Sequence, residues 1–519
     1  MDAILEDATI HHRRQTLHKT TNGFGLDDAY STTLDRIREQ KGNRVKLGME
    51  ALMWISCSER PLKAEELCHA LAVEVETTDL NIDNTPSIRT LLGCTLGLVT
   101  VDEQSSVVRL VHFTLQEYLA AHPNLFVTPH AMMAEICLTY LNFQFVCQFS
   151  ATLGTIPSAM SLIHYASCYW GFHARKDATK RAKRLALQLL QRDANHISAH
   201  ILLSERTVDF LSSEDRHYGK HPDLQGYSGL HCIAYMGIAE IAIAMVDMKV
   251  WDPNQRDSKG ATPLIWAAKH GNFTLARLLL EKEDVDPTVR DERGLTPLIH
   301  AAKAGHLDVV KLLLQRGNVD PNSRDPYWRT PLSYAAGFGH EDIVKLLLER
   351  GDVKPDSLHR IGLTPLAFAA GSGHEGIVKM LLEQGGANPN FWSKGGRTPL
   401  SVAAESGHEG IVKILLERVG LEPNRRDWSG RTPLSVAAES GHEGIVRKLL
   451  ERGDVKPDEP DESGQTPLSM AAKYGQEVVV KILLERGDVN PNSSDYRGPG
   501  FRMVRGRLVW TASPVESQV

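Results

Sequence analysis

Histidine is the metal-binding residue type that recurs most regularly in this chain. Successive members of one set differ by 34 in residue number, and they are His306, His340, His374, His408 and His442. A neutral imidazole nitrogen is a common zinc ligand, so this set is the first candidate for a functional site. Whether the rings can converge on one ion depends on the elements that carry them.

The cysteines and the catalytic motifs point away from enzyme chemistry. The seven cysteines include no Cys-x-x-Cys pair and precede the regular repeats, at positions 57, 68, 94, 137, 147, 168 and 232. We interpret them as buried free thiols. The chain has no G-x-S-x-G elbow and no G-x-x-x-x-G-K-[ST] phosphate loop, so we predict no enzyme activity, no cofactor and no metal.

The histidines belong to a segment that repeats with a period of 34. Thr-Pro occurs at 262, 296, 330, 364, 398, 432 and 466, and this periodicity indicates a solenoid. Thr262 can cap a helix that begins at Pro263, and Gly271 can end it in the left-handed conformation. Val309 and Leu313 place an apolar face on a second helix, which only a stacked neighbour can bury.

These residues resemble the ankyrin repeat, whose consensus the stretch TPLIHAAKAGHLDVVKLLLQRG at 296–317 follows closely. The resemblance implies an α-solenoid of about eight repeats over residues 217–498, the first divergent, with Ser228 in place of the threonine. It also implies histidines about 10 Å apart, too far to share a shell of roughly 2 Å Zn–N bonds. We therefore interpret the histidines as structural turn residues.

The array ends without a recognisable cap. Asp495 and Gly498 keep the register of the repeat, but Gly500 and Phe501 replace the next Thr-Pro. We expect an irregular tail over residues 499–519, produced by a truncated or frame-shifted end or, alternatively, by natural fraying.

The N-terminal half has the pattern of a winged helix. Helical segments at 47–55, 61–73 and 87–96 precede a hairpin of β-branched runs at 96–102 and 106–113, and a helix follows at 114–122. Winged helices often bind DNA, but the third helix carries only one basic residue, Arg89, and the wing is acidic at Asp102 and Glu103. Nucleic-acid binding is therefore the weaker alternative.

Residues 109–122, RLVHFTLQEYLAAH, resemble a segment in the winged-helix domain of NACHT-type STAND proteins, the NLR-like signal-transduction ATPases. The preceding segments ALMWISCSERPLKAEELCHALAVE and PSIRTLLGCTLGLVTVD resemble fungal NACHT-ankyrin proteins in particular. This winged helix is the type named after a GPI inositol-deacylase. In that family the motif histidine, here His112, contacts a bound nucleoside diphosphate. Because this chain has no phosphate loop, the resemblance implies nucleotide contact by His112 only when a NACHT ATPase module is present. The alternative is that His112 is a packed histidine at the junction between hairpin and helix.

The expected organisation is mostly α-helical. We assign residues 1–44 to an N-terminal remnant, the end of a lost NACHT module, and residues 45–127 to the winged-helix-like domain. Residues 128–216 form a helical spacer, which leads into the ankyrin solenoid at 217–498. The basic run at 180–184 in the spacer is interpreted as a solvated helix face.

Protein binding is the function that remains. In ankyrin proteins the hairpin tips and nearby first-helix positions line the concave face, and aromatic and arginine side chains there are typical binding hot spots. The predicted protein-binding residues are Tyr327, Trp328, Phe338, Trp392, Arg397, Glu405, Trp428, Arg431, Glu439 and Tyr474. Packing on the neighbouring finger is the alternative for each aromatic. Trp328 replaces a tip glycine, so the turn does not require it.

Composition leaves the partner open, because the net charge is only −6 with both signs interspersed. The chain has no apolar leader and no run of roughly 18 apolar residues, so we expect a soluble protein of the cytoplasm, or of the nucleus, without a membrane partner. The predicted function is the regulatory or sensor half of an NLR-like protein that binds a protein ligand. A stand-alone ankyrin scaffold is the alternative.

Overall fold

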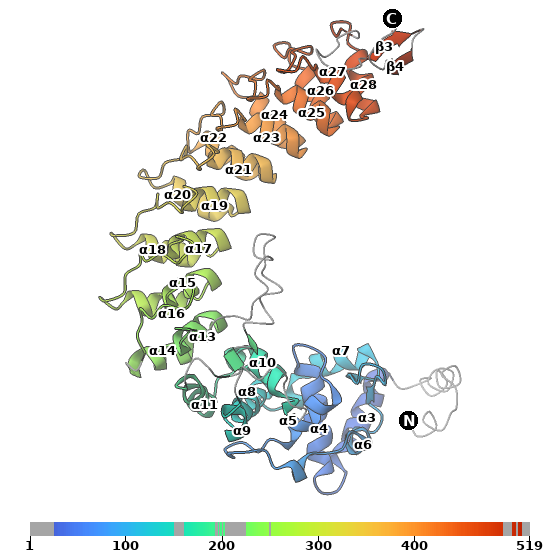
Figure 1. The fold of residues 1–519 in the computed structure, drawn as a ribbon. Helices are drawn as coiled ribbons and strands as arrows, with labels where there is room; N and C mark the ends of the chain where they lie inside the picture. Colours follow the sequence, from blue (N-terminus) through green and yellow to red (C-terminus); the bar gives the residue numbers. More distant parts are fainter. Residues whose placement is uncertain are drawn as a thin grey trace, which may run out of the picture. The chain divides into compact units, whose positions relative to one another are not determined.

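The computed structural model describes residues 25–149, 160–192, 196, 198–199, 201–202, 225–248, 251–490, 501–504 and 507–510. The chain divides into two compact units, Met1–Ser258 and Lys259–Val519. The first holds a winged helix, a helical spacer and one helix pair, and the second is built mainly from repeated helix pairs (Figure 1). The predicted fold class is confirmed.

The winged helix begins the first unit. Its helices before the hairpin are α3 (Leu26–Arg38), α4 (Arg44–Cys57), α5 (Ala64–Ala72) and α6 (Ile88–Cys94), with the short turn η1 (Ile82–Asn84). Strands β1 (Val99–Val101) and β2 (Val108–Leu110) pair antiparallel, with Thr100 opposite Arg109, and lead into α7 (Phe113–Ala121). Leu52 and Trp54 of α4 are fully buried at its core. Helices α4, α5 and α6, the hairpin and α7 confirm the predicted order of three helices, hairpin and helix, and α3 precedes them.

Helix α3 packs into the same core, although it lies in the segment 1–44. Leu34 and Ile37 are buried, and Tyr30 Oη lies 2.7 Å from Thr114 Oγ1 at the start of α7. Gln40 Nε2 donates to the Cys94 carbonyl at 2.7 Å. The domain boundary expected after residue 44 therefore falls inside one packed unit, which includes α3. The origin of residues 1–44 as a NACHT remnant stays a prediction, and residues 1–24 lie outside the described residues.

The spacer follows η2 (Pro123–Leu125) and contains α8 (Pro129–Leu141), α9 (Gln144–Cys147), α10 (Ile163–Lys176) and α11 (Lys180–Leu190). The divergent repeat forms α13 (Gly229–Met236) and α14 (Ala239–Met248) in the same unit. A Cβ added to Gly171 of α10 would lie 2.4 Å from Met236 Sδ, and one added to Gly229 would lie 3.0 Å from the Leu190 carbonyl. Because the spacer helices and this repeat pack so closely, the first unit extends past the boundary expected at 216.

The second unit stacks pairs of short helices. The first helices are α15 (Pro263–His270), α17 (Pro297–Ala304), α19 (Pro331–Phe338), α21 (Pro365–Ser372), α23 (Pro399–Ser406), α25 (Pro433–Ser440) and α27 (Pro467–Lys473). The second helices are α16 (Phe273–Leu280), α18 (Leu307–Leu314), α20 (Glu341–Leu348), α22 (Glu375–Glu383), α24 (Glu409–Leu416), α26 (Glu443–Leu450) and α28 (Glu477–Leu484). First helices pack on first helices and second helices on second. The loops between successive pairs project to one side (Figure 1).

The caps predicted for the repeat are confirmed. Thr262 Oγ1 accepts the Ile265 N–H at 3.4 Å, Pro263 is the first helical residue, and Gly271 ends α15 with φ +72°. Ala267 and Ala268 are completely buried, and their small side chains allow the next first helix to approach. The first helix α15 thus begins and ends at residues fixed by local chemistry.

The tail contains a short hairpin. Strand β3 (Phe501–Val504) pairs antiparallel with β4 (Arg507–Trp510), and Phe501 lies opposite Trp510. These strands differ from the irregular structure expected for 499–519; each contains one aromatic and one β-branched residue, types that favour strands. The remaining residues of the tail lie outside the described residues.

Candidate protein-binding surface

A finger is the six-residue segment that precedes each Thr-Pro, and one buried side chain shapes its turn. In the finger 324–329, Asp325 Oδ1 accepts the N–H groups of Tyr327 at 2.9 Å and Arg329 at 2.8 Å. Its other oxygen accepts from Tyr334 Oη at 2.9 Å. In the finger 426–431, Asp427 holds the turn in the same way. These carboxylates are therefore occupied by hydrogen bonds within the chain.

Neighbouring fingers are joined by their main chains. The Arg360 N–H donates to the Tyr327 carbonyl at 2.7 Å, and the Lys394 N–H donates to the Ile361 carbonyl at 2.7 Å. The Trp428 N–H continues the series to the Gly395 carbonyl at 3.0 Å. Pro326 stands at the equivalent position of the finger 324–329 and has no N–H to donate. The tips therefore form a continuous row that starts at Tyr327.

The aromatic side chains predicted to bind are exposed. About half of each of four residues is accessible, and Trp428 is 70% exposed. The four are Tyr327, Trp328, Trp392 and Phe338. The Arg425 guanidinium lies 3.7 Å from the Trp392 ring centroid, and that of Arg329 lies 5.1 Å from the Tyr327 centroid. Packing against arginine thus covers part of some rings and leaves the rest accessible.

Trp328 adopts a backbone conformation that disfavours a side chain. Its φ is +66°, whereas the equivalent positions are glycines with φ between +69° at Gly260 and +83° at Gly362. A residue with a Cβ in this left-handed region costs about 1–2 kcal/mol relative to its ordinary conformation. The finger therefore keeps an exposed indole at a position where glycine fits the turn better.

The predicted polar residues pair with one another. Arg397 forms an ion pair with Glu405, and Arg431 Nη1 lies 3.0 Å from Glu439 Oε2. Arg431 also pairs with Asp427 of its own finger, at 2.9 Å. These residues brace the finger against its first helix. Their charges are largely compensated within the chain.

Phe338 and Tyr474 come from a different position of the repeat. Phe338 is the last residue of α19 and Tyr474 follows α27, so both lie at the ends of first helices. The Phe338 ring lies 6.4 Å from that of Tyr334, between centroids. They form a second group beside the tip row. Binding by any of the predicted residues stays a prediction.

Sequence reasoning missed three exposed residues of the tip row, Arg360, Ile361 and Lys394. Arg360 and Lys394 stand four residues before a Thr-Pro threonine, at the position of Trp428, and Ile361 stands at the position of Tyr327. Aligning the repeats by their threonines could have found them. These residue types vary from repeat to repeat at the two tip positions, so only the alignment shows that the positions are equivalent.

The periodic histidines are structural. Nε2 of each lies between 3.0 and 3.3 Å from the carbonyl oxygen 37 residues earlier in the chain. In the last repeat Gln476 Nε2 makes the equivalent bond to the Glu439 carbonyl at 3.2 Å. A Cβ added to Gly305 would lie 2.6 Å from His340 Cε1, so the ring also fills the space beside the preceding turn. The interpretation of the histidines as turn residues is confirmed by these contacts.

His112 caps helix α7. Its Nδ1 accepts the Thr114 N–H at 3.3 Å and lies 2.8 Å from Thr114 Oγ1. The imidazole is exposed, and its ring centroid lies 4.5 Å from that of Phe113, which is itself exposed. The junction expected between hairpin and helix is present. A contact with nucleotide stays a prediction.

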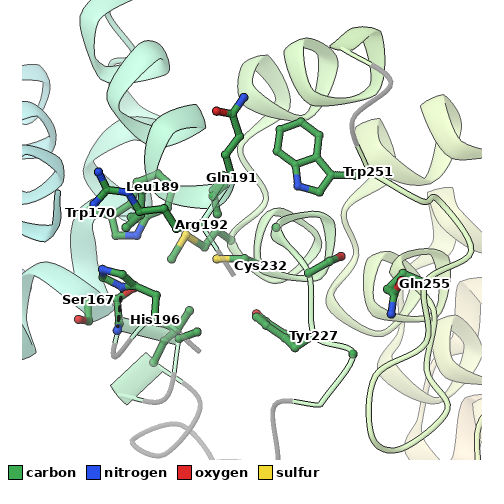
Figure 2. A pocket seen from close by; sticks show the side chains of 18 residues that line it. Ser167, Trp170, Leu189, Gln191, Arg192, His196, Tyr227, Cys232, Trp251 and Gln255 are labelled. Carbon is green, nitrogen blue, oxygen red and sulfur yellow. Dashed lines mark hydrogen bonds between the residues drawn. The ribbon is translucent and has the colours of Figure 1, made fainter. Parts of the chain in front are cut away.

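A cavity of about 330 Å³ lies within the first unit (Figure 2). His196, Tyr227, Cys232 and Trp251 are among its lining residues. Burial lowers the pKa of His196 to about 4 and raises that of Cys232 to about 12, so both are neutral near pH 7. A thiol with so high a pKa is a poor nucleophile. The cysteines are reduced, as predicted, although Cys57 and Cys147 are only partly buried.

Comparison with known families agrees with this architecture. Residues 36–125 match the family described as GPI inositol-deacylase, winged helix domain. Ankyrin repeats match at residues 245–301 and again at 283–358, 352–427 and 422–495. A comparison with curated proteins gives no match. Among the described helices, none is both long and apolar enough to cross a bilayer. The chain therefore carries a winged-helix domain of the GPI inositol-deacylase type followed by ankyrin repeats.

Proposed function

We propose that this chain is a non-enzymatic protein-binding protein whose ligand contacts the finger row from Tyr327 to Trp428. The observation that supports the proposal most strongly is Trp328, an indole about half exposed and held at φ +66°. Strain of this kind is often retained where a side chain has a function. The neighbouring Tyr327, Trp392 and Trp428 supply further aromatic contacts of the kind that dominate protein interfaces.

The shape of the surface favours a macromolecule over a small ligand. Small-molecule sites bury most of their ligand in a concave pocket. Trp328 lines an open hollow beside Pro355, but Tyr327, Trp392 and Trp428 are exposed by half or more on separate fingers. Several fingers joined side by side offer the extended area that a protein interface needs. Ankyrin repeats are protein-interaction modules, and the proposed surface lies on the fingers of the matched repeats.

The regulatory role is a second part of the proposal. We infer that the chain acts as the sensor half of an NLR-like protein of the cytoplasm, or of the nucleus, with a NACHT ATPase module as its partner. The winged helix of the GPI inositol-deacylase type and the following repeats support this order of domains. In that setting His112 and the exposed Phe113 would face the ATPase module. A scaffold without a signalling role is the alternative.

The binding proposal is tested on the full chain with a triple variant, Tyr327→Ala, Trp392→Ala and Trp428→Ala. A matched control changes Phe273, Val419 and Val478 to alanine, because these exposed residues lie outside the fingers. Proteins retained from a lysate of the source cells are quantified by mass spectrometry. We expect a partner that the control retains and the finger variant loses. Equal retention by both variants contradicts the proposal.

The signalling proposal makes a separate claim. A protein with a phosphate loop should co-purify with the full chain, and His112→Ala should alter its retention of labelled ADP more than His112→Asn, which keeps the helix cap. If no such ATPase is retained, the scaffold alternative is favoured while finger binding still stands.

A further inference from the structure

The middle of the finger row carries two cations without compensation. Arg360 and Lys394 are exposed, and neither has an ion pair with a carboxylate within the part of the chain that the structure describes. Their neighbours Arg397 and Arg431 differ, because these pair with Glu405 and Glu439. In the middle of the row the uncompensated positive charge therefore lies on two adjacent tips, whereas the exposed guanidinium of Arg324, at its start, lies 6.0 Å from the Trp328 ring centroid.

Main-chain bonds fix the order of side chains along the row. Arg360 is joined to Tyr327, Lys394 to Ile361, and Trp428 to Gly395. Tyr327, Ile361 and Trp428 are each exposed by half or more. Apolar and cationic side chains thus alternate over three successive inter-finger bonds.

We infer that the ligand of this row is an acidic segment of protein chain that also carries apolar side chains; this inference rests on the proposed function. The carboxylates meet Arg360 and Lys394, and the apolar side chains cover Tyr327, Ile361 and Trp428. Charge complementarity of this kind selects partners and accelerates their encounter, and salt weakens it.

A polyanion such as single-stranded RNA fits the row less well. Aromatic stacking beside cations is also how proteins hold single strands, but a strand presents a phosphate at every nucleotide and needs a continuous cationic track. Here the row turns acidic one finger beyond Trp428, where the exposed Glu462 donates its N–H to the Ser429 carbonyl at 3.0 Å. The cationic part is therefore short, which suits a few carboxylates.

The experiment selects a phage-displayed library of random 12-residue peptides on the immobilised full chain. The test variant combines Arg360→Glu with Lys394→Glu. The matched control combines Lys345→Glu with Lys379→Glu, which makes the same charge change at exposed positions of α20 and α22. All proteins are first compared by thermal unfolding, and the exposed positions predict unchanged midpoints.

We expect selected peptides with an excess of Asp and Glu over the library and at least one large apolar residue. Affinity for a synthetic copy should fall by at least about tenfold in the test variant, remain unchanged in the control, and weaken with salt. Selected peptides without acidic excess that still require Tyr327, Trp392 and Trp428 would overturn this inference and leave the proposed function standing. Failure to select any sequence contradicts both. Salt-dependent binding of labelled U12 RNA that requires Arg360 and Lys394 would assign the row to nucleic acid instead.

Discussion

At the scale of single residues, Trp328 combines an unfavourable backbone conformation with an exposed indole. Its turn is otherwise well made, since Asp325 accepts the N–H groups on either side and the Trp328 N–H donates to the Asp325 carbonyl at 2.9 Å. The strain therefore belongs to the Cβ at φ +66° and not to a missing hydrogen bond. Glycine would relieve it, but glycine would also remove the indole.

We therefore predict that Trp328→Gly raises the free energy of unfolding by about 1 kcal/mol, because the relief of strain exceeds the flexibility that glycine adds to the unfolded chain. Trp328→Ala is the control, since it also removes the indole but keeps a Cβ. Urea unfolding of both variants makes the comparison. Equal stability of the two would show that the backbone at this position is not strained.

His173 gives a pH-dependent prediction at the same scale. It is fully buried, with Nδ1 2.9 Å from His130 Nδ1 and Nε2 2.9 Å from Tyr165 Oη. Burial, with the charges of His130 and Lys176, lowers the pKa of His173 from 6.5 to about 3. Between these values the unfolded chain binds a proton that the folded chain excludes, so stability falls as the pH is lowered from about 6.5 towards 3.

We predict that His173→Gln, which can still form hydrogen bonds but does not titrate, loses less stability between pH 6 and pH 4. The difference in slope should be about 1 kcal/mol per pH unit. Amide hydrogen exchange of α10 at several pH values measures it locally. Parallel slopes in the two proteins would show that another group governs the acid response.

At the scale of elements, the histidine bonds hold successive repeats together. His408 Nε2 lies 3.1 Å from the Gly371 carbonyl, and the ring lies against Gly373. We predict that His408→Ala costs about 1–2 kcal/mol, because the carbonyl loses its donor and a void opens. His408→Gln should cost less, since Gln476 already makes this bond in the last repeat.

Denaturant unfolding compares the two histidine variants, and a titration with zinc accompanies it. Added zinc should leave the unfolding midpoint of the wild type unchanged, because the rings serve separate turns. A marked stabilisation by zinc would contradict the structural role of the histidines.

The elements also show which structural features could be predicted from the sequence alone. Thr262, Pro263 and Gly271 act on neighbours within a few residues, so their roles were predictable from local patterns. An alignment of the repeats places Arg360 and Lys394 at tip positions, but the bonds that set their neighbours along the row come from the structure. The His130–His173 pair joins residues far apart in sequence, which local patterns do not show. The pairing of Arg397 with Glu405 was missed for the same reason, since it depends on how the finger folds back on α23.

At the scale of the whole molecule, each repeat presents nearly the same surface to its neighbours. Residues 398–412 and 432–446 have identical sequences, and Leu400 and Leu434 are buried to the same extent. A repeat array is stabilised by each unit and by its contacts with adjacent units, so one unit can be removed in register.

We predict that deleting residues Thr398–Arg431, one 34-residue period, leaves a folded array, because α25 then meets α21 with the surface that α23 presented. Circular dichroism at 222 nm should show the same helicity per residue, and unfolding should remain cooperative. Deleting only Thr398–Ile414, half a period, is the control and should destabilise the array strongly. Similar behaviour of both deletions would contradict the repeat model.

The bonds that residues 360, 394 and 428 make to the preceding finger join main-chain atoms, so the side chains at these three tip positions are free to change. Any residue except proline can supply the N–H at positions 360, 394 and 428. The molecule thus separates the positions that hold it together from those that meet the outside. Single substitutions at the tips can therefore change the binding specificity of this surface while the repeats stay folded. The surface can evolve together with a partner through variants that all keep the fold.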